Sequence, residues 1–290
     1  MTALSSLARR SRVAVVGLAV GLVFATAGVA VGINLHTPRI ITPRTADQVT
    51  NIDILRSEIK NYYGAPGART GPTGDWMAPL NLDSNYAHEA EKVARKASNW
   101  LHRKADGSGN QAIVLDVDDT TLTTWNYELY SNWDFNPVTN GQFVTDQLFP
   151  GTPGMVALVN RAAADGYAIF FLTGRPQAQE GPTLGNLTDD NIGVDAGYPV
   201  PTEATAGVDG LFTKPAIGSY PAYLDKPEFC ASAIAASASC ATIPYKSGTR
   251  AYIESLGYDI VGNFGDQFSD LLGGFADRTF KMPNPNYYLP

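Results

Sequence analysis

A short apolar stretch that ends in acidic residues constrains the fold of this 290-residue chain more than any other feature. From position 112 to 122 it reads Ala-Ile-Val-Leu-Asp-Val-Asp-Asp-Thr-Thr-Leu. Such an apolar run, rich in branched residues and followed by polar ones, predicts a buried strand that enters a loop. Asp116 and Asp118 are two residues apart, so in an extended chain their side chains point the same way, with Cα atoms about 6.6 Å apart. This spacing suits a phosphoryl group held between a nucleophile and a proton donor.

The same residues allow two plainer interpretations, an acidic loop and a calcium site. A calcium loop needs more oxygen ligands in quick succession and a glycine turn. Leu122 and Trp125 supply neither. The stretch therefore favours phosphoryl chemistry over calcium binding.

Strand-like and helix-like segments alternate from this stretch almost to the C-terminus. The predicted strands cover 112–117, 167–172 and 259–263, and the predicted helices cover 155–164, 247–256 and 267–273. Such alternation indicates a parallel sheet with helices on both faces. In these sheets the ligand binds at the carboxyl ends of the strands. We therefore expect a three-layer α/β/α, Rossmann-like fold.

The N-terminus has the layout of an export signal. Three arginines precede an almost uninterrupted apolar run from Val13 to Val31, and small residues around Ala27 and Ala30 offer cleavage sites. The run is also long enough to span a bilayer, at roughly 20 residues. Residues 1–35 are therefore predicted to be a signal peptide or a membrane anchor, and the body to be secreted or held outside the cytoplasmic membrane.

Two helices are predicted between this leader and the acidic strand. A Pro-containing linker covers 36–44, and apolar residues recur at helical spacing within 46–63 and 84–102. Asp83 or Ser84 is the predicted N-cap of the second helix. Residues 64–81 read as a loop. We expect residues 45–105 to form a helical brace packed on a catalytic core at 106–290.

The charge of the chain argues against a general nucleic-acid binder. The formal net charge is −7, and loss of the three leader arginines would bring it to −10. Nucleic-acid binding depends on basic patches. The apolar content of 44% and the charged content of 17% are those of an ordinary globular protein and leave the function open.

The two cysteines, Cys230 and Cys240, lie in an Ala-rich segment. Export permits a disulfide between them. In one continuous helix their Cα atoms would be about 15 Å apart, which is too far to bridge. A disulfide therefore predicts a break in this segment, and an unbroken helix predicts free thiols.

Three further motifs follow the acidic strand. Thr173 and Gly174 end the second strand, where a hydroxyl and a backbone N–H could bind a phosphate oxygen. Lys246 precedes Ser247, the predicted N-cap of the 247–256 helix, and would lie near a helix N-terminus suited to anions. Asp266 and Asp270 are four residues apart and would share one face of a helix. Each motif alone is a weak indicator of function, and the order of the motifs after the acidic strand strengthens the prediction.

These motifs resemble the four signature motifs of the haloacid dehalogenase (HAD) superfamily. The chain resembles more closely its acid phosphatase branch, subfamily IIIB, which includes plant acid phosphatases and vegetative storage proteins. The matching segments are 171–175, 186–187, 245–250, 262–271 and 281–288. The resemblance covers roughly residue 45 to the C-terminus and departs at Glu180, where relatives often have arginine, and in the insertion at 229–241.

The resemblance implies a role for each motif. Asp116 would attack phosphorus and form an aspartyl-phosphate. Asp118 would protonate the leaving alcohol and then accept a proton from water. Thr173, with the backbone of Gly174, and Lys246 would bind the phosphate.

The resemblance also implies that the site holds a Mg²⁺ ion. Asp116, Asp266 and the backbone carbonyl of Asp118 would hold this hard cation. Asp270 would support the site by orienting Lys246 or a metal-bound water, and Thr120 belongs to the same signature.

The sequence lacks the residues that other phosphatase mechanisms need. All three histidines precede the acidic strand, no Cys-x5-Arg loop follows either cysteine, and no Gly-x-Ser-x-Gly occurs. Hydrolysis at carbon does not need the second acid at Asp118, so its presence favours phosphorus.

Two further segments, 121–149 and 283–288, are interpreted by how they would pack around the site. The aromatic residues between 121 and 149 could wall the substrate entrance or pack on the brace helices, and no crossover helix there is long enough for a large cap domain. The terminal segment 283–288 is expected to be a docking tail rather than part of the site.

The sequence therefore predicts an exported, Mg²⁺-dependent acid phosphatase acting on small phosphomonoesters. The alternatives are a non-catalytic storage or phospho-ligand-binding protein of the same fold and a phosphotransferase. The presence of Asp116 favours an enzyme. The natural substrate, the pH optimum and the oligomeric state are left open.

Overall fold

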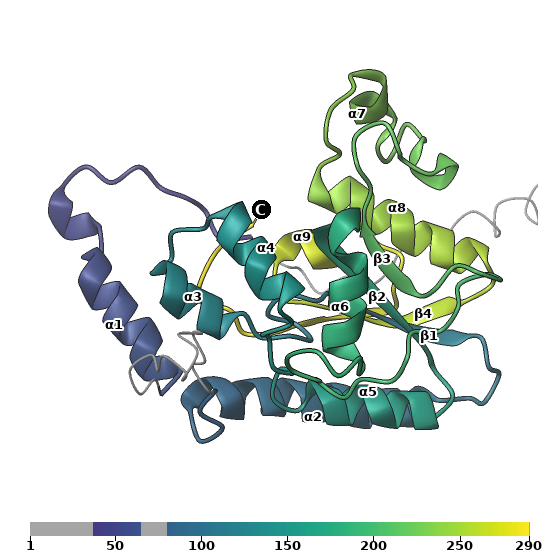
Figure 1. The fold of residues 1–290 in the computed structure, drawn as a ribbon, viewed down its shortest axis with the longest axis horizontal. Helices are drawn as coiled ribbons and strands as arrows, with labels where there is room; N and C mark the ends of the chain where they lie inside the picture. The colour runs from purple at the N-terminus through teal and green to yellow at the C-terminus, as the bar shows by residue number, and fades with distance from the viewer. Residues whose placement is uncertain (1–36, 65–79, 290) are drawn as a thin grey trace, which may run out of the picture.

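A parallel sheet forms the centre of the molecule in the computed structural model, which describes residues 37–64 and 80–289 (Figure 1). Within these residues the sheet has five strands in the order β3-β2-β1-β4-β5. The strands are β1 (Gln111–Leu115), β2 (Ala168–Pro176), β3 (Leu211–Lys214), β4 (Asp259–Gly265) and β5 (Arg278–Lys281). All four neighbouring pairs are parallel. The predicted parallel sheet is confirmed, and β3 and β5 are additional to the predicted strands.

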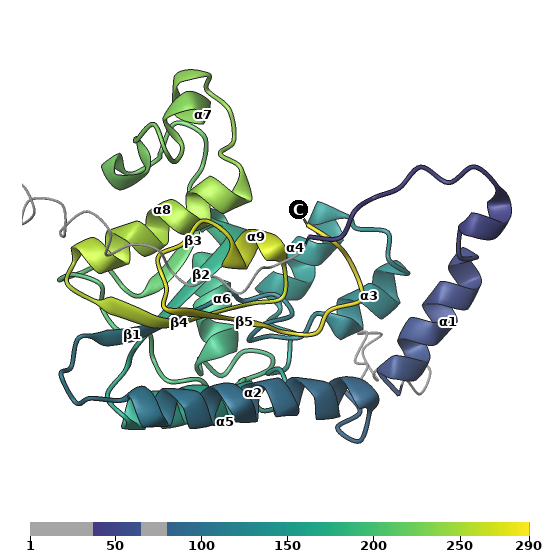
Figure 2. The same cartoon turned by 180° about the vertical axis from the view of Figure 1, so that it is seen from behind.

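The alternating residues of β1 separate two apolar cores. Ile113 and Leu115 pack with helices α2 (Asn85–Lys104) and α5 (Met155–Ala164) on one face. Ala112 and Val114 pack with α8 (Thr242–Ser255) on the other face. Because successive side chains of a strand point to opposite faces, one apolar run serves both layers. The three-layer fold is confirmed, and Figures 1 and 2 show the sheet between α8 and the α2–α5 pair.

Of the two helices expected in the brace, α2 packs on the main core, whereas α1 (Ile52–Tyr62) contacts a smaller cluster with Tyr86 and Trp125. Ser84 is the N-cap of α2, where its side chain accepts a hydrogen bond from the backbone N–H of Ala87. The prediction of one helix over 46–63 is wrong. A 3-10 turn (Ala46–Gln48) is followed by α1 (Ile52–Tyr62), because the Asn51 side chain accepts hydrogen bonds from two N–H groups of α1 and starts a new helix.

The aromatic segment after β1 forms two short helices, α3 (Trp125–Ser131) and α4 (Pro137–Thr145), rather than a cap domain. Trp125 stacks on Tyr63 of the brace, with ring centroids 4.0 Å apart. Tyr127 and Phe143 pack in the core shared with α2 and α5. For these residues the packing alternative holds rather than the entrance wall.

The Ala-rich segment is broken as a disulfide requires. Cys230 and Cys240 are bonded, with Cα atoms 5.4 Å apart. Helix α7 (Ala231–Ala235) ends between them, and α8 begins two residues after Cys240. In Figure 1 this segment projects from the body above α8.

The prediction of a helix at 247–256 with Ser247 as its N-cap is wrong. Helix α8 begins at Thr242, after Ala241. Pro244 lies in its first turn, where the missing N–H leaves no hydrogen bond unmade. The helix at 155–164 is confirmed at both ends.

The remaining helices are α6 (Glu180–Leu187), α9 (Phe268–Leu271) and two 3-10 turns (Gln177–Gln179 and Ala222–Leu224). The predicted leader and most of the predicted 64–81 loop lie outside the described residues. None of the helices in residues 37–64 and 80–289 combines the length and the apolar content that crossing a bilayer requires.

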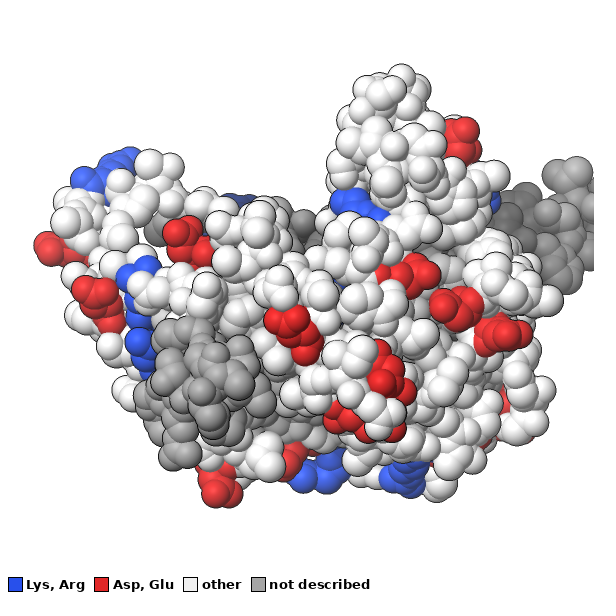
Figure 3. Space-filling view, viewed as in Figure 1, with Lys and Arg blue, Asp and Glu red and all other residues white. Residues whose placement is uncertain are grey.

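Acidic and basic side chains both appear on the face of the molecule drawn in Figure 3. On the face in Figure 3, acidic residues are spread among basic ones, and the described residues there form no broad basic patch.

Candidate active site

The loop after β1 is a tight turn rather than extended chain. The strand ends at Leu115, and the N–H groups of Thr120, Thr121 and Leu122 all donate to the carbonyl of Val117. Asp119 has a φ of 54°. The extended geometry assumed in the prediction for Asp116 and Asp118 therefore ends at Val117, where the turn begins.

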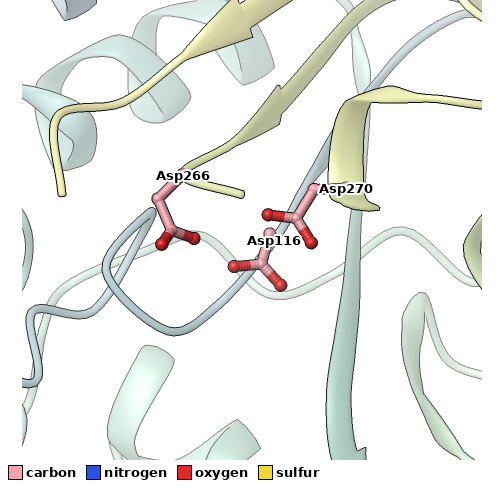
Figure 4. Close-up of side chains that lie close together, drawn as sticks. All are labelled: Asp116, Asp266 and Asp270. Carbon is pink, nitrogen blue, oxygen red and sulfur yellow. The ribbon is translucent and has the colours of Figure 1, made fainter. Parts of the chain in front are cut away.

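Three buried carboxylates meet at the carboxyl end of the sheet (Figure 4). Asp116 follows β1, Asp266 follows β4, and Asp270 lies in α9. One carboxylate oxygen of each lies within 4.8 Å of one from each of the others. Because β1 and β4 are neighbours in the sheet, their ends bring Asp116 and Asp266 together. Asp266 precedes α9, so the predicted shared helix face is wrong, although the two side chains do converge.

Lys246 joins two of these carboxylates. It is the fifth residue of α8, inside the helix rather than at its N-terminus as predicted. Its Nζ forms buried ion pairs with Oδ1 of Asp116 and with Oδ1 of Asp270, the latter at 2.6 Å. The side chain thus acts as a point charge within the carboxylate cluster, and the helix terminus has no part in it.

The cluster has more negative than positive charge. Burial, and after it the carboxylate of Asp270, raises the pKa of Asp116 well above its ordinary value. Burial and Asp270 raise the pKa of Asp266 to about 8. Although burial lowers the pKa of Lys246, Asp116 and Asp270 raise it above its ordinary value. Oxygen ligands with excess negative charge are those that hard divalent cations prefer, so the residues fit such an ion.

Asp118, the second acid of the motif, binds Arg175. Nη2 of Arg175 donates to Oδ1 of Asp118 at 2.7 Å, and Nε donates to Oδ2 at 3.1 Å. Nη1 donates to the Thr183 hydroxyl at 3.0 Å. The Asp118 side chain is 33% exposed, against 8% for Asp116. Asp118 thus lies on the open side of the site, in a fixed orientation.

Thr173 and Gly174 line the end of β2. The Thr173 hydroxyl oxygen accepts a hydrogen bond from the N–H of Arg175 at 3.1 Å, which leaves its hydrogen free to donate. A Cβ atom at Gly174 would meet no neighbouring atom within 4 Å. Open space therefore lies beside the backbone of Gly174, whereas the Thr173 side chain is buried.

Asp266 is surrounded by hydrogen-bond donors. Thr120 donates its hydroxyl to Oδ1 at 3.2 Å. Gln267 and Asn284 donate side-chain N–H groups to Oδ2, at 2.5 and 2.7 Å. Thr120 was expected here from the signature.

Sequence reasoning missed the roles of Arg175, Gln267 and Asn284, although all three lie in the segments that carry the resemblance. The signal for Arg175 was its positive charge at the end of the Leu-Thr-Gly-Arg motif, in a chain whose first and last motifs carry aspartates. Asn284 had no such signal, because the tail was expected to dock away from the site.

Comparisons with known proteins identify the family of the chain. A model of the family described as HAD superfamily, subfamily IIIB (Acid phosphatase) matches residues 57–205 and 232–290. Acid phosphatase 1 of Solanum lycopersicum is 26% identical over 220 residues, which are 74% of each chain. The Stem 28 kDa glycoprotein of Glycine max is 28% identical over 209 residues, 70% of each chain.

Two further similarities extend the comparison. Vegetative storage protein 2 of Arabidopsis thaliana is 50% identical over 219 residues, 73% of this chain and 69% of that protein. The solved structure of the class C acid phosphatase from Bacillus anthracis is 19% identical, with a TM-score of 0.47, and the match covers 69% of this chain and 80% of that one.

Proposed function

Because the chain belongs to the acid phosphatases of HAD subfamily IIIB and is therefore a phosphatase hydrolase, we propose that it hydrolyses small phosphomonoesters through an aspartyl-phosphate on Asp116. The observation that carries this proposal is the position of Asp116. Its carboxylate lies beside Lys246 and within the Asp266–Asp270 cluster, with Asp118 held separately by Arg175. One carboxylate is thereby available for attack and a second for proton transfer.

In the first half-reaction a carboxylate oxygen of Asp116 attacks phosphorus and the ester P–O bond breaks. Asp118 gives a proton to the departing alkoxide, so the alcohol leaves neutral. In the second half-reaction water attacks phosphorus, Asp118 accepts its proton, and the bond between phosphorus and Asp116 breaks. The products are inorganic phosphate and the original Asp116 carboxylate.

Lys246, Thr173 and the backbone N–H of Gly174 would bind the phosphoryl oxygens. Positive charge and preorganised donors favour a transition state whose charge lies on those oxygens. The free hydrogen of the Thr173 hydroxyl and the open space at Gly174 support this assignment.

HAD phosphatases typically use a divalent metal, and we propose Mg²⁺ here. Asp116, Asp266 and the backbone carbonyl of Asp118 would hold the ion. Asp270, which also lies in the cluster, would orient Lys246. When bound, the ion would offset the charge of the carboxylates and polarise a phosphoryl oxygen.

We also propose that the body acts outside the cytoplasmic membrane. The disulfide between Cys230 and Cys240 supports an oxidising compartment, and the basic and apolar leader supports export. The body at 45–290 would be one catalytic unit, with 45–105 as its brace and 36–44 as a linker. Whether 1–35 is cleaved separates a secreted enzyme from an anchored one.

Two other functions use the same site. A storage role, with or without binding of a phospho-ligand, is suggested by the name of the Arabidopsis relative. A phosphotransferase would pass the phosphoryl group from Asp116 to an acceptor alcohol instead of water. The nucleophile Asp116 favours catalysis over storage.

The test is hydrolysis of p-nitrophenyl phosphate from pH 4 to 8 by the purified protein, with and without Mg²⁺. We expect Mg²⁺-dependent turnover that the Asp116→Asn variant loses, and a phosphorylated peptide containing Asp116 after acid quenching. Asp53→Asn is the matched control, because Asp53 lies on α1 with its side chain 86% exposed. Equal, metal-insensitive rates in the parent and Asp116→Asn would refute the mechanism. Absence of turnover in both would favour binding or storage.

A further inference from the structure

The C-terminal strap, which we define as residues 283–289, follows β5 and passes α9 toward α3 and α4 (Figures 1 and 2). Its far end is held beside the site. The Leu289 N–H donates to Oε1 of Gln267 at 2.9 Å, and the Ser269 hydroxyl donates to the Leu289 carbonyl at 3.4 Å. The strap therefore docks, as predicted for 283–288, but the prediction that it lies apart from the site is wrong, because Asn284 contacts Asp266.

Asn284, near the start of the strap, joins two buried carboxylates of different loops. Its Nδ2 donates to Oδ2 of Asp266 at 2.7 Å and to Oδ2 of Asp119 at 3.3 Å. A side-chain amide nitrogen carries two hydrogens, so it can serve both oxygens. Asp119 also accepts hydrogen bonds from the N–H and hydroxyl of Thr124. Asn284 thus ties the loop after β4 to the loop after β1.

The orientation of Asn284 is fixed from its other side. Its Oδ1 accepts a hydrogen bond from the N–H of Asn286 at 2.8 Å. Asn286 donates its amide to the Tyr63 hydroxyl at 3.0 Å and accepts from Nε1 of Trp133 at 3.3 Å. Tyr63 is fully buried and stacks on Trp125. A chain of hydrogen bonds therefore runs from the N-terminal brace to the Asp266 carboxylate.

We infer that Asn284 is a positioning residue for Asp266, and that the strap thereby raises the affinity of the site for a divalent cation. The inference rests on the proposed function, because the cation is the one proposed there. The Asn284 amide holds Oδ2 of Asp266, so the orientation of Oδ1, which accepts one hydrogen bond from Thr120 and has a second lone pair for the ion, is fixed as well. Partners that orient a ligating side chain typically change metal affinity about 10- to 100-fold.

The test measures binding of MgCl₂ by titration calorimetry with the purified protein and no substrate. For Asn284→Ala we expect the Mg²⁺ dissociation constant to rise at least about 10-fold. Asn284→Gln keeps an amide donor, so its Mg²⁺ dissociation constant should lie between those of Asn284→Ala and the parent. Asn160→Ala is the matched control, because the Asn160 amide also donates to two oxygens, the carbonyls of Val156 and Gly197, on an exposed part of α5.

If Asn284→Ala does not fold, as judged by near-ultraviolet circular dichroism, Asn284→Ser replaces it, since a serine side chain is too short to reach both carboxylates. A dissociation constant within two-fold of the parent, in whichever of the two variants folds, would overturn the inference. A parent that binds no Mg²⁺ would instead refute the Mg²⁺ assignment of the proposed function, and the inference with it. The two failures are distinguished by the parent titration.

Discussion

Replacing Arg175 by lysine should show whether proton transfer by Asp118 depends on the orientation of its side chain. Arg175 binds Asp118 through two nitrogens, at 2.7 and 3.1 Å, and its side chain is only 4% exposed. Lysine keeps the positive charge but has a single donor atom, so it cannot reproduce the planar two-point contact. The loss of one charge-assisted hydrogen bond corresponds to about 1.5–3 kcal/mol, which is about 10- to 150-fold in rate if the whole loss falls on proton transfer.

The assay compares kcat/KM for two substrates that differ in how much they need a proton donor. p-Nitrophenolate leaves readily without protonation, whereas the alkoxide of glycerol 2-phosphate needs a proton. We expect Arg175→Lys to lower kcat/KM for glycerol 2-phosphate by about 10- to 150-fold and for p-nitrophenyl phosphate by much less. Arg161→Lys is the control, because the Arg161 side chain on α5 is 41% exposed.

An equal fall for both substrates would refute this reasoning. It would mean that Arg175 supports the loop as a whole, through Thr183 and its position 5.3 Å from the centre of the Phe149 ring. Unchanged rates for both substrates would show that the orientation of Asp118 does not limit the reaction.

Two further predictions concern stability. Replacing Cys230 and Cys240 by serine opens a loop of ten residues, so the free energy of unfolding in urea should fall by about 3 kcal/mol on the entropic model; an unchanged midpoint would show that this segment unfolds before the core. The pKa of Asp266 is raised from 3.8 to about 8 in the metal-free fold. Between these pH values the folded protein therefore binds a proton that the unfolded chain does not, and the free energy of unfolding falls as pH rises from about 4 through 8. The melting temperature in EDTA should therefore be lower at pH 8.5 than at pH 5, and Mg²⁺ should reduce the difference; a melting temperature that rises with pH would contradict the charge excess at this site.

Local pattern was sufficient for helices whose apolar residues recur regularly at helical spacing. Helix α5 was predicted to the residue, and Ser84 was identified as a candidate N-cap of α2. Pattern failed at α8, which begins five residues before the predicted Ser247. Ala241 makes no side-chain cap there, so the capping residue on which the prediction relied does not mark the start of α8.

The convergence of Asp116, Asp266 and Lys246 could be anticipated from the order of the motifs, because the carboxyl ends of parallel strands meet at one edge of the sheet. The partners of these residues could not. Arg175 reaches Asp118 across 57 residues of sequence, and Asn284 reaches Asp266 across 18. Such contacts depend on how a loop turns and where a tail docks, and neither has a period that a sequence displays.

The sequence by itself determined the fold class, the family and the identity of the candidate reacting groups, because strand and helix periods and motif order are properties of neighbours along the chain. Only the tertiary structure decided which carboxylate faces Arg175, that Lys246 acts from inside α8, and that the C-terminal strap contacts Asp266. These arrangements are set by side chains that meet across the packed layers, where burial makes each unpaired charge costly and so selects its partner.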